Sequence, residues 1–432
     1  MIFVFYFFAA LQVFLGYKSL RGGIDFLNFF KSEINRPKSE FVPFVSIIAP
    51  CRGLDEGLES NLTALFRQDF PRYEIVFAVD DERDEAVSII EKVSREKGEL
   101  REESSKFKVQ SSKTGDQIEN PKSNCFGGEN SVSAKLIVAG KATDSSQKVH
   151  NLRRAVLEVS GESKVFVFVD SDARPNADWL RNLIAPLRNE NVGAATGYRW
   201  FVAKRGGFAS QLLSVWNASI ASALGDERKA NFCWGGSTAM RRDTFEKLGI
   251  GEKWRGTLSD DYAVTRAMKE ANLPVRFVPQ ALTASVEDYS SSQLLEFTTR
   301  QMKITRVYAA HLWAASFVGS FLFSTIFWTG VLLLFFLTGW HFRLTLLFLS
   351  IIFTLGAAKA WIRLNAVKLV LKDYQKQLNQ SFWWQITLWT ISPVLFFFND
   401  FAALFSRRIV WRGIEYQLKS PYETVIITRD KK

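Results

Sequence analysis

The chain contains 432 residues with a formal net charge of +11, and 47% of its residues are hydrophobic. This length is enough for more than one hydrophobic core, and a mean hydropathy of -0.02 indicates apolar segments joined to a region of ordinary soluble composition. The sequence has no basic helix, zinc-finger spacing or aromatic RNA-binding motif, and Cys51, Cys125 and Cys233 are isolated, which argues against nucleic-acid binding, a zinc site and a disulfide framework.

The chain begins with an apolar segment over residues 2–15. Its basic residues, Lys18 and Arg21, follow the apolar stretch instead of preceding it, and no small-residue cleavage site is evident. An uncleaved anchor over residues 1–22 is therefore favoured over a signal peptide. Tyr17 and Leu20 would extend the apolar stretch to the roughly 20 residues that a bilayer requires.

Strand-like and helix-like segments alternate from residue 45 onward. Strands are predicted over 45–49, 74–79 and 134–139, and helices over 58–66, 82–96 and 149–159. This alternation is typical of an α/β nucleotide-binding domain, which we place at residues 40–310. Residues 98–133 interrupt it, and because they carry few large apolar side chains we predict a flexible insertion there.

Residues 165–172, Val-Phe-Val-Phe-Val-Asp-Ser-Asp, form an apolar run that ends in two carboxylates. Such a run is typical of a buried parallel strand, and ligand crevices of open α/β sheets lie at the carboxyl ends of the strands. Asp170 and Asp172 would repel each other unless a cation lies between them, and a divalent ion carrying a nucleotide diphosphate is the common solution. Asp-Ser-Asp also caps helices, and helix-favouring residues follow at 177–187, so capping and metal binding both remain open on this motif alone.

Three segments follow the carboxylate motif. Residues 207–224 are amphipathic, and would lie on the bilayer or pack on the sheet. Trp234-Gly235-Gly236-Ser237 offers an aromatic ring beside exposed backbone, which suits a sugar or acceptor and equally a tight turn. A helix is predicted to begin at Ser259-Asp260-Asp261-Tyr262. Because Ser259 or Asp260 is sufficient as its N-cap, the carboxylate of Asp261 is available for another role.

Three further apolar runs, over 312–337, 344–360 and 382–405, have spanning or near-spanning length. Tryptophans flank them, as expected at a headgroup boundary. Basic residues follow the N-terminal anchor and the run 344–360, so both stretches and the α/β domain are predicted to be cytosolic. The chain is thus expected to be an integral membrane protein with helices over 311–406 and a basic tail over 407–432.

The run 382–405 is the exception to this simple topology. A crossing would carry Arg407, Arg408 and Arg412 to the opposite face, against the positive-inside tendency. Asn399 and Asp400 also interrupt the run. A re-entrant or interfacial segment would satisfy both facts, and the sequence leaves the choice open.

Taken together, these motifs resemble inverting family-2-type glycosyltransferases with the GT-A fold, and among them the ceramide glucosyltransferases of family 21. The landmarks occur in the family's order: Val79-Asp80-Asp81, Asp170-Ser171-Asp172, Ser259-Asp260-Asp261-Tyr262 and Arg300-Gln301-Met302-Lys303-Ile304. The last departs from the family's Gln/Arg-x-x-Arg-Trp, since Lys303 and Ile304 stand where the family has Arg and Trp. Lysine cannot make the planar bidentate contact with pyrophosphate that arginine makes. Arg306 is a candidate substitute.

The resemblance implies an α/β domain of the GT-A type, with a mixed, mostly parallel sheet and transmembrane helices at both ends. It implies transfer of a hexose, glucose by analogy, from a UDP-sugar donor to a lipid hydroxyl such as that of ceramide, assisted by Mg²⁺ or Mn²⁺. The expected metal ligands are Asp170 and Asp172, and the expected general base is Asp261. The expected nucleotide-sugar contacts are Pro50, Asp80, Asp81, Lys148, Asp170 and Ser171, and the expected acceptor or pyrophosphate contacts are Trp234, Gly235, Asp260, Arg300 and Lys303. For Lys148 and Arg300, a solvated surface position remains the alternative.

Two other functions are weighed against the lipid glycosyltransferase. A processive polysaccharide synthase of the same superfamily is disfavoured by the incomplete final signature and the few spans. A membrane scaffold or transporter subunit that kept the fold without chemistry is disfavoured by the intact Asp170, Asp172 and Asp261.

Overall fold

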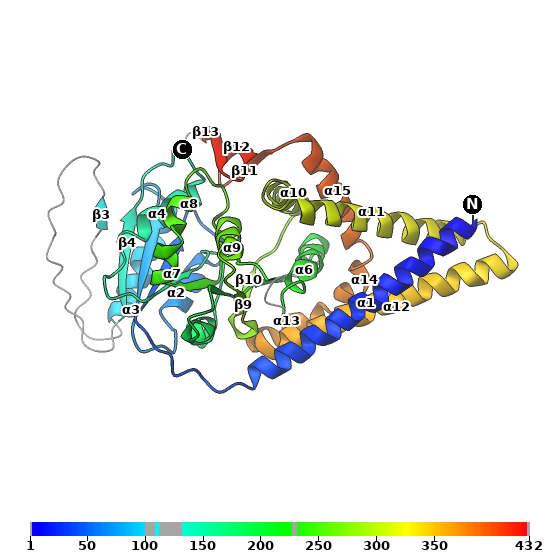
Figure 1. Cartoon of the computed structure of the whole chain (residues 1–432), viewed down its shortest axis with the longest axis horizontal. Helices are drawn as coiled ribbons and strands as arrows, with labels where there is room; N and C mark the ends of the chain where they lie inside the picture. Colours follow the sequence, from blue (N-terminus) through cyan, green and yellow to red (C-terminus); the bar gives the residue numbers. More distant parts are fainter. Residues whose placement is uncertain (1, 100–108, 112–131, 227–230, 430–432) are drawn as a thin grey trace. The chain divides into compact units, whose positions relative to one another are not determined.

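The computed structural model describes residues 2–99, 109–111, 132–226 and 231–429, which divide into two compact units (Figure 1). We call one the sheet unit; it contains Pro37–Arg199, Asp226–Ser285 and Val410–Lys432. The other, the helical unit, contains Met1–Arg36, Trp200–Gly225 and Val286–Ile409. The boundaries between the units lie at 36/37 and 225/226 and within the strands β7 (Arg199–Val202), β10 (Thr283–Val286) and β11 (Arg408–Trp411).

An eight-stranded sheet with the order β3-β4-β2-β1-β5-β8-β6-β9 forms the core of the sheet unit. Its strands are β1 (Val45–Pro50), β2 (Tyr73–Val79), β3 (Val109–Ser111), β4 (Ser133–Val138), β5 (Val165–Phe168), β6 (Ala194–Thr196), β8 (Thr238–Arg241) and β9 (Val275–Phe277). Only β8 runs antiparallel to its neighbours in this sheet, β5 and β6. This arrangement confirms the predicted α/β class with a mixed, mostly parallel sheet.

The central strands are buried along their whole length because they are continuous apolar runs. β1 pairs in parallel with β5, from Val45 opposite Val165, so both strands end at the same edge of the sheet. β5 ends at Phe168, earlier than the apolar pattern suggests, because the backbone turns at Asp170, whose carbonyl accepts from the amide of Ala173. Asp170 and Asp172 therefore lie in the loop beyond the strand.

The helices of the sheet unit connect these strands. They are α2 (Leu58–Leu65), α3 (Glu85–Glu99), α4 (Gln147–Ala155), α5 (Trp179–Ile184), α7 (Arg242–Lys247), α8 (Ile250–Lys253) and α9 (Asp260–Glu270), with 3-10 turns η1 (Ala185–Arg188) and η2 (Pro279–Ala281). α4 begins before the predicted position because Ser146 caps it, accepting a hydrogen bond from the amide of Val149. Of the predicted insertion at 98–133, residues 100–108 and 112–131 lie outside the described residues, while β3 within it pairs in parallel with β4.

Residues expected as a basic tail form a small antiparallel sheet of β11 (Arg408–Trp411), β12 (Ile414–Ser420) and β13 (Glu423–Arg429). The hairpin of β12 and β13 is held against the start of α4. Tyr416 Oη accepts from the backbone amide of Gln147 at 3.1 Å, and Arg429 donates to Gln147 Oε1 at 2.9 Å and to the carbonyl of Ala142 at 2.6 Å. This hairpin thus fixes the helix turn that carries Lys148.

Gly256→Ala is expected to destabilise the protein by about 2 kcal/mol more than Gly249→Ala does, because its methyl group would overlap the carbonyl of Tyr422 in the hairpin. Gly249 is a matched control: its φ of +60° resembles the +71° of Gly256, but a methyl group there meets nothing within 4 Å. Thermal unfolding of the two purified variants measures the difference. Equal unfolding temperatures would contradict the described docking of the hairpin.

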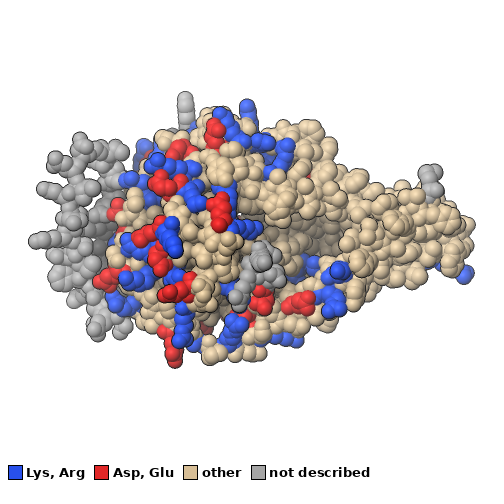
Figure 2. Space-filling view, in the orientation of Figure 1, with Lys and Arg blue, Asp and Glu red and all other residues tan. Residues whose placement is uncertain are grey.

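The helical unit consists of α1 (Ile2–Ile34), α6 (Phe208–Ala221), α10 (Ser291–Tyr308), α11 (Ala310–Leu333), α12 (Gly339–Val370), η3 (Lys372–Tyr374), α13 (Gln375–Gln380), α14 (Phe382–Leu388) and α15 (Ser392–Phe405). Within the described residues, α1, α11 and α12 are long and apolar enough to cross a membrane. Figure 2 shows few charged side chains in the region where α1 begins, α11 ends and α12 begins. α14 and α15 are bent by 59° and would form a broken span or a re-entrant loop.

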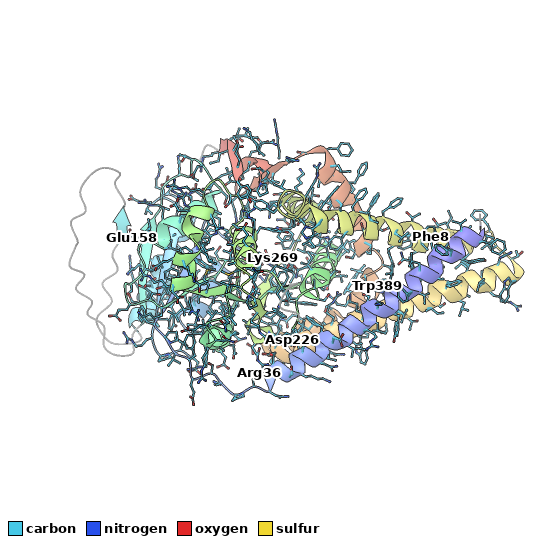
Figure 3. The ribbon with its side chains drawn as sticks, in the orientation of Figure 1. Phe8, Arg36, Glu158, Asp226, Lys269 and Trp389 are labelled. Atoms are coloured by element: carbon cyan, nitrogen blue, oxygen red, sulfur yellow. The ribbon has the colours of Figure 1, made fainter. Side chains whose placement is uncertain are left out.

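α1 and α12 pack side by side and run in the same direction (Figure 1). Tyr6 Oη donates to the carbonyl of His341, and Gly23, further along α1, lies against Lys359, further along α12. Trp389, labelled in Figure 3, lies against Gly356 of α12. The small side chains at these contacts allow close packing of the apolar helices.

The amphipathic segment predicted at 207–224 forms α6. Its apolar side chains pack in a cluster with Phe201 of β7 and with residues of α10, α14 and α15. Trp216 of α6 is buried and stacks on Phe396 with a centroid distance of 4.8 Å. The amphipathic pattern shows that one face is buried but does not say against what.

Candidate active site

Asp170 and Asp172 lie in the loop after β5, and two cations hold them. Arg199 places Nη1 at 2.8 Å from Asp172 Oδ2 and Nη2 at 3.5 Å from Asp170 Oδ2. Lys148, on the first turn of α4, lies 2.7 Å from Asp170 Oδ1 and 3.0 Å from Asp260 Oδ1. Lys148 thus bridges the loop after β5 and the start of α9, and the alternative of a solvated surface position for Lys148 is wrong.

Asp260 and Asp261 occupy the first turn of α9, where the N-terminal amides favour negative charge. Ser259 is the N-cap, accepting from the amide of Tyr262, and its hydroxyl also donates to Asp261 Oδ1. The amide of Tyr262 donates to the same oxygen at 2.7 Å, while the amide of Gly235 lies 3.5 Å from Asp261 Oδ2. One oxygen of Asp261 is therefore fixed, and the other is directed towards Gly235.

The charges in this cluster shift one another's pKa values. Burial raises the pKa of Asp260 to about 6, opposed by Lys148 and reinforced by the neighbouring Asp261. Burial also raises the pKa of Asp172 above its ordinary value, against the effect of Arg199. Although burial acts in the opposite sense, Lys148 and Arg199 hold the pKa of Asp170 below its ordinary value. Such shifts are common where charged groups are gathered for chemistry.

Trp234 and Gly235 line the same cluster. The guanidinium carbon of Arg199 lies 4.7 Å from the centre of a Trp234 ring, and Tyr198 packs on the same side chain. Gly235 is confined: a methyl group there would overlap Asp260 Oδ2 and would lie 2.8 Å from Lys148 Nζ. The absence of a side chain at Gly235 lets Lys148 and Asp260 meet.

We expect Gly235→Ala to lower the turnover of the reaction that the resemblance implies about a hundred-fold, because displacing charged groups by about 1 Å in an active site costs that much. Gly161→Ala, where a methyl group meets nothing within 4 Å, is the matched control and should keep full turnover. Initial rates with both variants at saturating donor test this. Unchanged turnover in Gly235→Ala would show that the contact between Lys148 and Asp260 is dispensable.

The residues expected to contact the nucleotide lie at the carboxyl ends of β1 and β2. Pro50 ends β1, and the buried Asp80 follows β2 and forms an ion pair with Arg52. Asp81 is more exposed, and hydrogen bonds from Arg83 lower its pKa to about 2. Asp81 is therefore ionised at neutral pH.

A second acidic contact lies beside the metal motif. Ser171 Oγ donates to Asp55 Oδ2 at 2.6 Å, and Asp55 forms an ion pair with Arg412. Arg412 has a φ of +51° in the turn between β11 and β12, which brings its side chain back to the loop before α2. The small C-terminal sheet of β11, β12 and β13 thus supplies a cation, Arg412, to this edge of the large sheet.

Arg300 and Lys303 belong to α10 of the helical unit. Arg300 Nη1 lies 3.4 Å from Glu296 Oε1, and Lys303 Nζ donates to the carbonyl of Arg408 at 2.9 Å. Their expected contact with pyrophosphate stays a prediction.

The fit of a divalent cation to Asp170 and Asp172 rests on their oxygen atoms. Asp172 Oδ1 is buried without a hydrogen-bond partner, whereas its Oδ2 pairs with Arg199. Within the described ranges, no three His, Cys, Asp or Glu side chains lie together as a complete protein metal site. Two carboxylates with an open oxygen fit Mg²⁺ or Mn²⁺, because such ions are commonly bound by one or two carboxylates plus the phosphates of the substrate.

Sequence reasoning missed Arg199, Asp55 and Arg52. Arg199 is the first residue of β7 and lies between two aromatic residues, Tyr198 and Trp200, which is a weak signal for a buried cation. Asp55 and Arg52 lie in the loop after β1, and ligand-binding residues of α/β sheets are often found in such loops. Their position in the sequence was therefore the one indication that they belong to the site. Their partners are distant in the sequence.

Comparison with known proteins places this site in a family. Residues 6–125 and 130–423 match the family Glycosyl transferase family 21. Over 74 residues, 17% of this chain and 14% of the relative, the sequence is 30% identical to ceramide glucosyltransferase from Komagataella phaffii. The match therefore spans only a small part of that relative's length.

Two solved structures are also similar. Mannosyltransferase PcManGT from Pyrobaculum calidifontis, in complex with GDP-Man and Mn²⁺, is 15% identical with a TM-score of 0.44, covering 92% of this chain and 98% of that one. Glucosyl-3-phosphoglycerate synthase from Mycobacterium tuberculosis, in complex with Mn²⁺, UDP and its product, is 12% identical with a TM-score of 0.34, covering 61% and 79%. Because the family match extends over most of the sequence, this chain belongs to glycosyltransferase family 21.

Proposed function

We propose that the protein is a membrane-bound inverting glycosyltransferase that moves a hexose, glucose by family analogy, from a UDP-sugar to a lipid hydroxyl such as that of ceramide. The observation that carries this proposal is the junction made by Lys148, which joins Asp170 of the metal motif to Asp260 beside Asp261. Glycosyl transfer requires that the groups that bind the donor phosphate and the group that deprotonates the acceptor hydroxyl lie within one substrate length of each other.

The donor is activated at its diphosphate. A divalent cation bound to Asp170 and Asp172 would stabilise the negative charge that grows on the leaving phosphate oxygen. Arg199 holds both carboxylates in place, and Lys148 adds positive charge at Asp170. Asp80 and Asp81, at the end of β2, are proposed to contact the uracil base, with Pro50 and Ser171 beside the nucleotide.

Asp261 is proposed to accept the proton of the acceptor hydroxyl. Its Oδ1 is held by Ser259 and by the amide of Tyr262, and its Oδ2, which has a longer contact of 3.5 Å with the amide of Gly235, is proposed to take the proton. The hydroxyl attacks the anomeric carbon from the face opposite to the diphosphate, so the configuration inverts. Trp234 and Gly235 lie on the acceptor side of this arrangement, and Arg300 and Lys303 are proposed to contact the pyrophosphate.

The acceptor is proposed to be a lipid because an amphiphile does not readily leave the bilayer. Among the described residues, the helical unit has three helices that could span a membrane, and most of the sheet unit lies between them in the sequence. The sheet unit is proposed to be cytosolic, which the basic residues after the anchor and in the second half of α12 support through the positive-inside tendency.

The test is a transfer reaction with the purified full chain. UDP-glucose, UDP-galactose, UDP-N-acetylglucosamine and GDP-mannose are each incubated with a total lipid extract and with Mg²⁺ or Mn²⁺, and lipids are analysed by mass spectrometry. We expect one lipid class to gain a single hexose mass from a UDP-sugar, with EDTA stopping the reaction. A ladder of hexose additions would indicate a processive synthase instead. No transfer and no UDP release with any donor would favour a scaffold.

A further inference from the structure

A cavity of about 420 Å³ lies inside the helical unit, bounded by α1, α6, α11, α12 and the bent pair α14 and α15. Much of its wall is small or apolar, including Gly16, Gly319, Phe323 and Leu355. Two positively charged side chains of α12, Lys359 and Arg363, also line it. Because they are four residues apart, they share one face of the helix.

Arg363 is buried without compensation. Its side chain is 4% exposed, its Nε has no hydrogen-bond partner, and within the described residues it forms no ion pair. Lys359 Nζ is 2.7 Å from the hydroxyl of Ser19 on α1, a neutral partner. Buried charges of one sign are costly unless an anion accompanies them, especially among membrane helices.

The acidic side chain on the neighbouring α15 does not supply this anion. Asp400 Oδ2 accepts from Ser316 of the cavity wall at 2.7 Å, and Asp400 forms no ion pair with Lys359 or Arg363. The cavity therefore has two cations and needs a ligand with negative charge.

The position of the cations along the helices points to a lipid. Lys359 lies at the end of the apolar run 344–360 of α12, opposite Gly23 of the parallel α1. Lys18 and Arg21 lie at the same level of α1, just after its apolar run, as expected near a headgroup layer. An anion at this depth with apolar walls beside it matches a phosphate carried on a hydrocarbon chain.

We propose that this cavity binds the anionic phosphate headgroup of a membrane lipid between Lys359 and Arg363, with its hydrocarbon chain against Gly16, Phe323 and Leu355. This ligand is neither the sugar donor nor the neutral acceptor of the proposed reaction. Binding is measured without a donor, so its failure is distinct from a failure of the proposed function.

The test measures lipid retention by the full chain, purified in detergent and delipidated, using native mass spectrometry and thermal unfolding. Dioleoylphosphatidylglycerol should bind and raise the unfolding temperature, whereas zwitterionic dioleoylphosphatidylcholine should bind about ten-fold more weakly. Arg363→Gln and Lys359→Gln should each weaken phosphatidylglycerol binding about ten-fold. Inorganic phosphate alone should give no stabilisation at millimolar concentration.

Arg343→Gln is the matched control, since Arg343 is an exposed arginine on α12 that does not line the cavity. It should retain phosphatidylglycerol like the unchanged protein. If Arg363→Gln does not fold, Lys359→Gln and the charge-conserving Arg363→Lys, which should keep most of the binding, decide the question. Equal binding of the two lipids, equal loss in Arg343→Gln, or equal stabilisation by inorganic phosphate would overturn the proposal.

Discussion

Replacing Asp261 with asparagine is expected to lower the rate of glycosyl transfer about a thousand-fold, because a positioned general base contributes roughly 10²- to 10⁴-fold to such a step. Asparagine is nearly the same size and can still accept hydrogen bonds from Ser259 and the amide of Tyr262, so the start of α9 should stay folded. It cannot accept the proton of a hydroxyl. Donor binding, measured by calorimetry, should change little.

The control is Asp144→Asn, which removes an exposed carboxylate of the same unit whose pair with Arg153 is 3.5 Å long. Such exposed pairs contribute little to stability, so this variant should keep full activity. Ordinary turnover in Asp261→Asn would remove Asp261 from the mechanism. A parallel loss of donor binding would assign it to the donor site instead.

Replacing Arg199 with leucine is expected to destabilise the protein by about 3 kcal/mol, because removing one partner of a buried ion pair leaves the other charge uncompensated. Arg199 is the cation that contacts both Asp170 and Asp172, and these side chains are all largely buried. The contact of its guanidinium with Trp234 is lost as well. Chemical or thermal unfolding measures the effect.

Arg255→Leu is the matched comparison, since Arg255 pairs with Glu252 where both side chains are exposed. It should cost less than about 1 kcal/mol. Mn²⁺ should stabilise Arg199→Leu more than the unchanged protein, because the two carboxylates then need another cation. If Mn²⁺ has the same effect on both proteins, Asp170 and Asp172 do not bind the metal.

The local elements of the sheet unit could be predicted because their causes are local. Apolar runs long enough for one strand mark β1, β2 and β5, and a charged amphipathic segment marks α3. The observed start of a helix differs from the predicted one where a capping side chain sets it. Ser146 caps α4, so this helix begins before its predicted position. The carboxylate motifs could also be predicted from the sequence, because ligand-binding residues of α/β sheets follow the carboxyl ends of the strands.

The sequence by itself determined the apolar helices, the alternation of strands and helices, and the acidic motifs, because each depends on residues close together in the chain. Only the tertiary structure decided which cation meets which carboxylate: Arg199 with Asp172, Lys148 with Asp260, and Arg412 with Asp55. It likewise decided that α6 packs among helices and that the C-terminal residues form a hairpin against α4. An ion pair between distant residues leaves no periodic pattern, since its two halves become neighbours only when the strands and helices that carry them have packed.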